Sequence, residues 1–101
     1  MIHVTDDEML IIQDIIKEYA PDCDVLVYGS RYKGTHWKYS DLDLSFKGKK
    51  KLGLYRIGDI KEAFAESDLP YRVDVHDYNA TADSFKAIID SGCETIAHAC
   101  G

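Results

Sequence analysis

The chain has 101 residues, of which 46% are apolar, which is enough to build the hydrophobic core of a single domain over residues 1–101. No apolar run reaches the length of a membrane-spanning helix, and the N-terminal sequence MIHVTDDEM lacks the basic and apolar regions of a signal peptide. We therefore expect a cytoplasmic protein with no membrane partner. The net charge of −6 also makes nucleic acid an unfavourable partner.

Charge is distributed unevenly along the chain. Residues 31–56 contain eight lysines and arginines against two aspartates, whereas the rest of the chain contains four basic residues against sixteen acidic ones. A compact basic segment on an acidic protein favours binding of a small polyanion. The run from Lys49 to Lys51, between Gly48 and Gly53, is better explained as a solvated loop.

The first predicted elements are a helix and a buried strand. Thr5 followed by Glu8 is a capping-box pattern that predicts the start of the helix. Its apolar stripe consists of Met9, Ile12, Ile15, Ile16 and Tyr19. The β-branched run at residues 25–28 then predicts a strand, and residues 29–35 predict a turn with one or two helical turns that end at Gly34.

The second half of the chain predicts two more strands and two more helices. Alternating apolar residues predict strands at 41–46 and 71–76. Helical spacing predicts one helix at 54–67 and another at 80–91. The resulting order favours an α/β (α+β) fold, in which a small mixed sheet is flanked by helices.

Aspartates in the last two predicted strands indicate a metal site. Asp41 and Asp43 point to the same face of a strand, where two carboxylates repel each other unless a cation lies between them. Carboxylate oxygens suit a hard cation such as Mg²⁺. Asp74 lies between Val73 and Val75 in the third strand. If the two strands are neighbours, the three acids can hold two metal ions, which activate a hydroxyl and stabilise a leaving phosphate oxygen.

The sequence VYGSRYKG supplies the features of a phosphate site directly after the first strand. Gly29 lets the backbone approach a ligand closely, and Ser30 begins a short helix whose free N–H groups can bind an anion. Arg31 and Lys33 add positive charge. We therefore expect a nucleotide triphosphate, held at its far end by Gly29 and Ser30 and at its metal-bound end by the aspartate pair.

The spacing of these motifs resembles that of a known family. A Gly-Ser pair, ten intervening residues and Asp-Leu-Asp are similar to the signature of the polymerase beta-like nucleotidyltransferase superfamily. GSRYKG and SDLDL, in so short a chain, resemble its minimal nucleotidyltransferases, and the likeness continues through IKEAF at residues 60–64 and SDLPYRVDV at residues 67–75. Members of this group are commonly paired with a HEPN-type helical protein, as the antitoxin of a toxin–antitoxin system.

The resemblance implies a polymerase beta-like fold and transfer of AMP from ATP to a hydroxyl of a HEPN-type partner, with tyrosine as the expected acceptor. It assigns phosphate binding to Gly29 and Ser30, and metal binding to Asp41 and Asp43. Asp74 would be the third acid, which helps to activate the incoming hydroxyl. Two Mg²⁺ ions, or Mn²⁺ in their place, are the implied cofactors.

The sequence is less favourable to two other classes of function. A nucleotide-binding module could neutralise a helical toxin by contact alone, without catalysis. The intact set of three acids favours the enzyme. A nucleic-acid-binding domain is disfavoured by the acidic residues outside 31–56.

Other polar and aromatic residues near the motifs have simpler explanations. We expect Trp37 and Tyr39 to pack over the loop rather than to stack on a base. His36 and His76 are expected at a loop or a strand edge rather than as catalytic bases, and Asp77 is expected to start a turn.

The C-terminal segment carries no predicted function. Cys23, Cys93 and Cys100 show no C-x-x-C spacing, so we expect reduced thiols. Cys93, His98 and Cys100 offer three ligands, which falls short of a structural zinc site. The sequence SGCETIAHACG resembles nothing in the superfamily.

Overall fold

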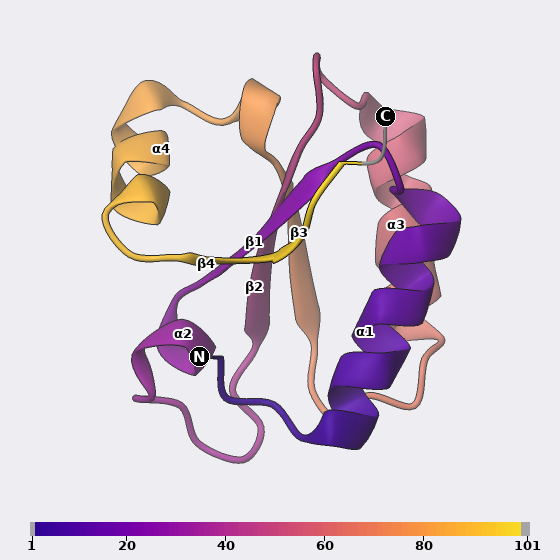
Figure 1. Ribbon diagram of the computed structural model, residues 1–101, viewed down its shortest axis with the longest axis vertical. Helices are drawn as coiled ribbons and strands as arrows, with labels where there is room; N and C mark the ends of the chain where they lie inside the picture. Colours follow the sequence, from indigo (N-terminus) through magenta and orange to yellow (C-terminus); the bar gives the residue numbers. More distant parts are fainter. Residues whose placement is uncertain (1, 100–101) are drawn as a thin grey trace.

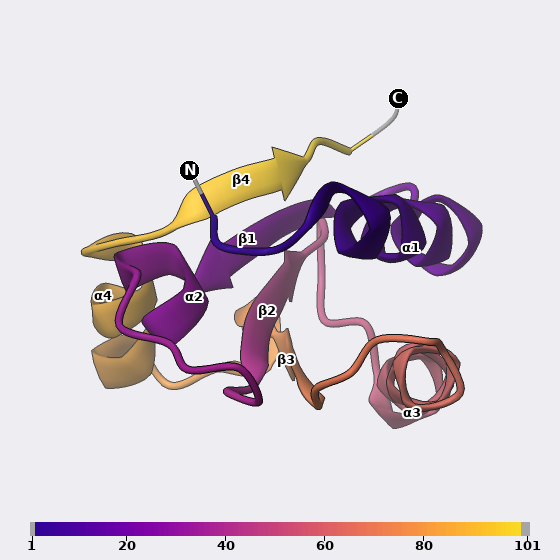
Figure 2. The same cartoon turned by 90° about the horizontal axis from the view of Figure 1, so that it is seen from below.

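A four-stranded sheet with helices on both faces forms the framework of the protein (Figures 1 and 2). The computed structural model describes residues 2–99. The elements in chain order are α1 (Asp6–Tyr19), β1 (Asp24–Tyr28), α2 (Ser30–Lys33), β2 (Leu42–Lys47), α3 (Leu54–Ala65), β3 (Val73–Asp77), the 3-10 helix η1 (Tyr78–Ala80), α4 (Asp83–Asp90) and β4 (Glu94–Ala97). The predicted fold class, a small mixed sheet with flanking helices, is confirmed. Within the described part of the chain no helix has the length and apolar character needed to cross a bilayer.

The strand order brings residues from distant parts of the sequence into one row. The sheet has the order β3-β2-β1-β4, with β1 antiparallel to both its neighbours and β2 parallel to β3. In this register Tyr28 lies opposite Asp43, and Asp43 lies opposite Asp74. Side chains opposite each other on neighbouring strands point to the same face. Tyr28, Asp43 and Asp74 therefore share one face of the sheet.

Two apolar layers enclose the sheet. The larger layer packs against α1 and α3, and its fully buried members include Ile12, Val25, Val27, Leu42, Leu44, Phe46 and Ile60. The smaller layer lies on the α4 side and contains Leu26, Tyr28, Tyr78 and Ile89. Figure 2 shows α4 and the α1–α3 pair on opposite sides of the sheet. Alternation along β2 therefore separates an apolar face from the face that carries Asp43.

Helix α1 begins as the capping box predicts. Thr5 Oγ1 accepts a hydrogen bond from the backbone N–H of Glu8 at 3.1 Å, and the Thr5 N–H donates to Glu8 Oε1 at 3.0 Å. The Tyr71 hydroxyl donates to the same Glu8 Oε1 at 3.0 Å, which ties the start of α1 to the segment before β3. Within the predicted stripe Ile12 and Ile16 are buried, whereas Tyr19 is exposed.

The structure corrects the prediction at the C-terminal end. The single helix predicted at 80–91 is instead η1 followed by a shorter α4. Asp77 starts the turn as expected, since its Oδ1 accepts a hydrogen bond from the Asn79 N–H at 3.2 Å. Residues 94–97, to which no element was assigned, form the edge strand β4 beside β1.

Apolar residues of α3 and α4 are not all buried. Leu54 and Ile88 fit the helical spacing that predicts these two helices, yet both are exposed. Cys23 and Cys93 are free thiols, as expected. Cys100, and with it the three-ligand set considered for zinc, lies outside the described residues.

Candidate active site

Three carboxylates gather where β2 and β3 begin. Asp43 lies in β2, Asp41 directly precedes this strand, and Asp74 lies in β3 opposite Asp43. All three are partly buried. Burial, followed by repulsion from Asp74 and then Asp41, raises the pKa of Asp43 to about 6. The structure thus brings together the three acids that the sequence indicates, in surroundings that favour a cation.

A guanidinium group lies beside these carboxylates. Arg72 Nη2 is 3.5 Å from Asp41 Oδ2 and 3.7 Å from Asp74 Oδ1. Sequence reasoning missed Arg72, although its place two residues before Asp74 puts both side chains on the same face of an extended segment. Among residues 2–99 no three acidic, histidine or cysteine side chains converge closely enough to hold a metal ion as they stand.

Gly29, at the junction of β1 and α2, lies against Asp43. Its φ is 78°, and a Cβ placed there would lie 2.3 Å from Asp43 Oδ2. Only glycine allows both this conformation and this close approach. Ser30 is the first residue of α2, so its N–H has no acceptor within the helix and remains available to a ligand.

Arg31, predicted to bind phosphate, is a buried structural residue. It is only 4% exposed, and its guanidinium donates hydrogen bonds to the backbone oxygens of Ser40 and His3 at 3.0 Å and of Lys38 at 3.2 Å. The same group stacks on the Tyr71 ring, 3.7 Å from its centroid. Because the side chain is buried and all three guanidinium nitrogens donate to backbone oxygens, the predicted phosphate contact does not fit this structure.

The sequence of residues 11–97 matches the profile of the family described as polymerase beta, nucleotidyltransferase. The matched segment includes the Gly29-Ser30 pair, all three acids and β4. The chain belongs to the polymerase beta nucleotidyltransferase family. It is therefore a nucleotidyltransferase, and the family resemblance seen in its sequence is confirmed.

Individual proteins also resemble this chain, one in sequence and two in fold. The nucleotidyltransferase is 42% identical over 86 residues to a Haemophilus influenzae protein named "Probable protein adenylyltransferase MntA", and the match covers 85% of this chain and 75% of that protein. A toxin–antitoxin structure with AMP-PNP has the same fold, with a TM-score of 0.77, 18% identity and coverage of 89% of this chain and 73% of that chain. The structure of a tri-AMPylated Shewanella oneidensis HEPN toxin in complex with MNT antitoxin also has this fold. Its TM-score is 0.68 at 15% identity, and the match covers 89% of this chain and 69% of that chain.

The donor set of the nucleotidyltransferase fits Mg²⁺ that arrives with a nucleotide. Proteins usually hold Mg²⁺ through one or two carboxylates, while substrate phosphates and water complete the octahedron. Asp41 and Asp43 can supply these carboxylates without a preformed cage of three ligands. Burial, and then repulsion from Asp74 and Asp41, raises the pKa of Asp43, and a cation would relieve that repulsion.

Two buried hydroxyls on the site face have no hydrogen-bond partner among the described residues, those of Tyr28 and Ser45. Burial, and then the charges of Asp43 and Asp74, raise the pKa of Tyr28. Its ring lies 6.1 Å from that of His76 and 5.8 Å from that of Phe85, between centroids. Sequence reasoning treated Tyr28 only as a strand residue; its place directly before Gly29 was the available signal.

The loop between α2 and β2 carries exposed side chains near the phosphate motif. Trp37 and Tyr39 contact each other edge to face, with centroids 5.6 Å apart, yet they are 66% and 52% exposed. Their rings contact each other, and the expectation that they do not stack on a base stays a prediction. Lys33 is exposed on α2 and stays a predicted phosphate contact.

The lysine-rich turn lies far from the carboxylates. Lys47 is opposite Asp24 at one end of the β1–β2 pair, and Asp43 is opposite Tyr28 at the other. The basic segment 31–56 is therefore not one compact patch, because its buried arginine, Arg31, and this turn lie in different places. The exposure of Lys49, Lys50 and Lys51 agrees with the predicted solvated loop.

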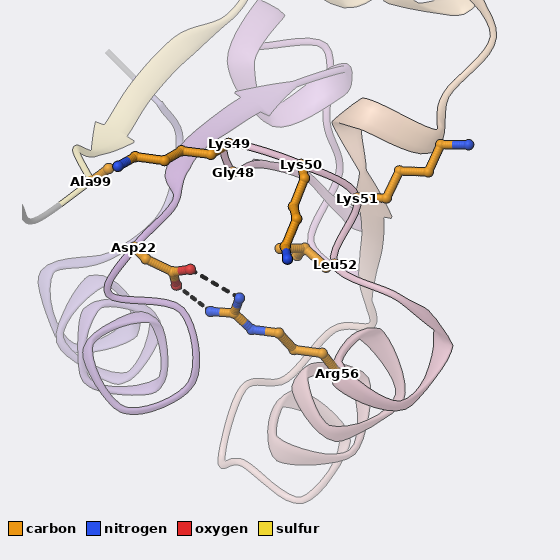
Figure 3. A pocket seen from close by; sticks show the side chains of 8 residues that line it. All are labelled: Asp22, Gly48, Lys49, Lys50, Lys51, Leu52, Arg56 and Ala99. Carbon is orange, nitrogen blue, oxygen red and sulfur yellow. Dashed lines mark hydrogen bonds and ion pairs between the residues drawn. The ribbon is translucent and has the colours of Figure 1, made fainter.

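This turn borders a cavity of about 520 Å³ (Figure 3), which is lined by Asp22, Gly48, Lys49, Lys50, Lys51, Leu52, Arg56 and Ala99. Arg56 Nη1 donates to Asp22 Oδ2 at 3.0 Å across the cavity wall. In Figure 3 Lys49 extends toward Ala99, whereas Lys51 points away from the cavity. The lysines do not converge on one point, as a built anion site would require.

Gly29→Ala is expected to destabilise the protein by about 2 kcal/mol, because it combines a positive φ with a clash against Asp43. Gly58→Ala is the matched control. Gly58 lies inside α3, where an added Cβ would meet nothing within 4 Å, and alanine is favoured in a helix by about 1 kcal/mol. Chemical denaturation measures both variants, and a Gly29→Ala protein as stable as the control would contradict the close approach.

Proposed function

We propose that this nucleotidyltransferase transfers AMP from ATP to a tyrosine hydroxyl of a HEPN-type partner protein, for which it serves as the antitoxin. The observation that carries the proposal is the close approach of Gly29 to Asp43, with Asp74 opposite Asp43 on the next strand. The 42% identity to the H. influenzae protein supports adenylyl transfer to a protein. The complex with AMP-PNP and the tri-AMPylated HEPN toxin support ATP as donor and a HEPN-type acceptor.

The groups divide the binding of the nucleotide between them. The backbone at Gly29 and Ser30, the Ser30 hydroxyl and the exposed Lys33 would hold the phosphates. Asp41 and Asp43 would hold Mg²⁺, as one or two ions, or Mn²⁺ in its place. The bound metal would neutralise charge on the phosphate oxygens and lower the pKa of the attacking hydroxyl.

The transfer itself is an in-line displacement. The tyrosine oxygen of the partner attacks the α-phosphorus of ATP, and the bond from this phosphorus to the pyrophosphate oxygen breaks as pyrophosphate leaves with the electron pair. The proton of the tyrosine passes to the Asp74 carboxylate, whose side chain is 38% exposed and can be reached by the acceptor. Asp74 thus acts on the acceptor, whereas Asp41 and Asp43 act on the nucleotide.

Isotopic labelling tests the proposed reaction. With Mg²⁺ and a HEPN-type protein from the same organism, ATP labelled at the α-phosphorus should label the partner, and ATP labelled at the γ-phosphorus should not. Asp43→Asn should abolish the α-label. Labelling from the γ-phosphorus would show phosphorylation instead of AMP transfer and contradict the proposal.

A second candidate function is a binding module that neutralises the partner by contact alone. One observation favours it. Arg72 occupies the space beside Asp41 and Asp74, and among the described residues no three side chains converge as ligands of a metal ion. In that case the partner would carry no label from either ATP, yet its toxic activity would still be blocked when the two proteins are mixed.

A further inference from the structure

We propose that Arg72 is an internal cation that pairs with Asp41 and Asp74 and competes with the metal for Asp41, and that it moves to the phosphates when the metal and nucleotide bind together. This inference rests on the proposed metal site. It makes Arg72 a positioning residue that couples metal binding to nucleotide binding, a role that neither the motifs nor the family match assigns to it.

The position of Arg72 is fixed by its backbone. Its carbonyl accepts a hydrogen bond from the Leu42 N–H at 2.9 Å, which extends the parallel pairing of Leu42 with Val73 by one step. Arg72 therefore lies beside Asp41 across the strands. Because it precedes Asp74 by two residues, its side chain is on the same face as the carboxylates.

The Arg72 side chain is placed to neutralise two carboxylates at once. A single nitrogen, Nη2, lies 3.5 Å from Asp41 Oδ2 and 3.7 Å from Asp74 Oδ1. A metal bound by Asp41 and Asp43 would be repelled by a guanidinium held so close to Asp41. One positive group at a time can occupy this space, so metal binding requires Arg72 to leave.

Arg72 is free to leave because little else holds its side chain. The side chain is 77% exposed, and ion pairs as exposed as these contribute at most about 1 kcal/mol. Arg31 differs, because its guanidinium is buried and donates hydrogen bonds to three backbone carbonyl oxygens. Arg72 can thus rotate without unfolding the strand that carries it.

The nucleotide supplies the destination for the displaced charge. A guanidinium binds phosphate oxygens through paired hydrogen bonds, and the triphosphate would lie beside the carboxylates that hold its metal. Metal alone would displace the Arg72 side chain into solvent. When metal and ATP bind together, Arg72 would instead exchange its two carboxylate partners for phosphate oxygens. We therefore expect the protein to bind Mn²⁺ weakly without nucleotide and more tightly with it.

Mn²⁺ binding without nucleotide, measured by electron paramagnetic resonance, tests the competition. Arg72→Gln should bind free Mn²⁺ at least 5-fold more tightly than the unmodified protein, and Arg72→Lys should restore part of the weak binding because it keeps the charge. Lys61→Gln is the control. Lys61 and Arg72 both line a groove beside β3, but Arg72 is the residue that forms the ion pairs with Asp41 and Asp74. The control should leave Mn²⁺ affinity unchanged within 2-fold.

Calorimetry with Mn²⁺–ATP completes the test. Arg72→Gln should bind this complex no more tightly than the unmodified protein, because the gain in metal affinity is offset by the lost phosphate contact. If the unmodified protein binds Mn²⁺–ATP but Arg72→Gln gains no affinity for free Mn²⁺, the competition is refuted and the metal site stands. If the unmodified protein and Arg72→Gln both fail to bind Mn²⁺–ATP, the proposed metal site is refuted as well.

Discussion

Arg31→Met is expected to lose about 3 kcal/mol of folding stability. Methionine retains an apolar chain of similar length but removes the donors that serve the backbone oxygens of Ser40, His3 and Lys38. Each buried acceptor that loses its charged donor destabilises the fold by about 1 to 3 kcal/mol, and the total is smaller where the loop relaxes so that water binds these oxygens. The stacking of the guanidinium on Tyr71 is lost in addition.

The control for this variant is Lys33→Met, which removes an exposed positive charge from the same short helix. Its stability should change by no more than about 0.5 kcal/mol. Urea denaturation of the two variants gives the comparison. If Arg31→Met were as stable as the unmodified protein and instead lost affinity for ATP, the buried structural role would be wrong and the phosphate contact predicted from the sequence would be restored.

Asp43→Asn is expected to stabilise the metal-free protein by about 1 kcal/mol at pH 7, an effect reduced by the partial solvent exposure of the site. The substitution keeps the shape of the side chain and removes a charge that burial and the neighbours Asp74 and Asp41 disfavour. The folded-state pKa of about 6 lies above the ordinary aspartate pKa of 3.8, so ionisation of Asp43 opposes folding. This cost is complete above pH 6, decreases as the pH falls, and disappears below pH 4.

Denaturation of the metal-free protein across this range measures the effect. The contribution of Asp43 makes the unmodified protein more stable as the pH falls from 7 toward 4, and the Asn variant lacks that contribution. The advantage of Asp43→Asn should therefore be largest at pH 7 and absent near pH 4. A variant that is less stable at pH 7 would contradict the electrostatic account of the site.

The same substitution should weaken binding of Mg²⁺–ATP by at least about 10-fold, because it removes a carboxylate ligand of the metal. Asp59→Asn is the matched control, since it removes an exposed carboxylate from α3. Isothermal titration calorimetry of both variants decides the point. Unchanged affinity in Asp43→Asn would show that this aspartate does not bind the nucleotide's metal.

The fold was predictable where the local pattern and the tertiary structure agree. The capping box at Thr5 and Glu8 marks the start of α1, and the alternation around Asp43 gives both the strand and its polar face. Strand β4 was missed because the four residues ETIA carry a weak local signal. Its existence depends on pairing with β1, seventy residues earlier in the sequence, across an irregular register.

The candidate site was predictable as a set of motifs, but not as an arrangement of charges. Strand alternation, a local property, put Asp41 and Asp43 on one face of a strand. Asp74 was predicted to join them only if the two strands were neighbours, a condition that the pairing of β2 with β3 meets. The two arginines show the limit of this approach. Burial makes Arg31 structural, and the ion pairs of Arg72 depend on which strands are neighbours, so neither role can be read from position in the sequence.

The central claim is that this protein attaches AMP to its partner and that Asp74 activates the acceptor. Intact-mass spectrometry of the HEPN-type partner, mixed with the protein, ATP and Mg²⁺, tests it most directly. The unmodified protein should add one or more AMP units to the partner. Asp74→Asn should add none while it still binds Mg²⁺–ATP through Asp41 and Asp43. A partner whose mass stays unchanged with the unmodified protein, although its activity is blocked, would contradict the claim.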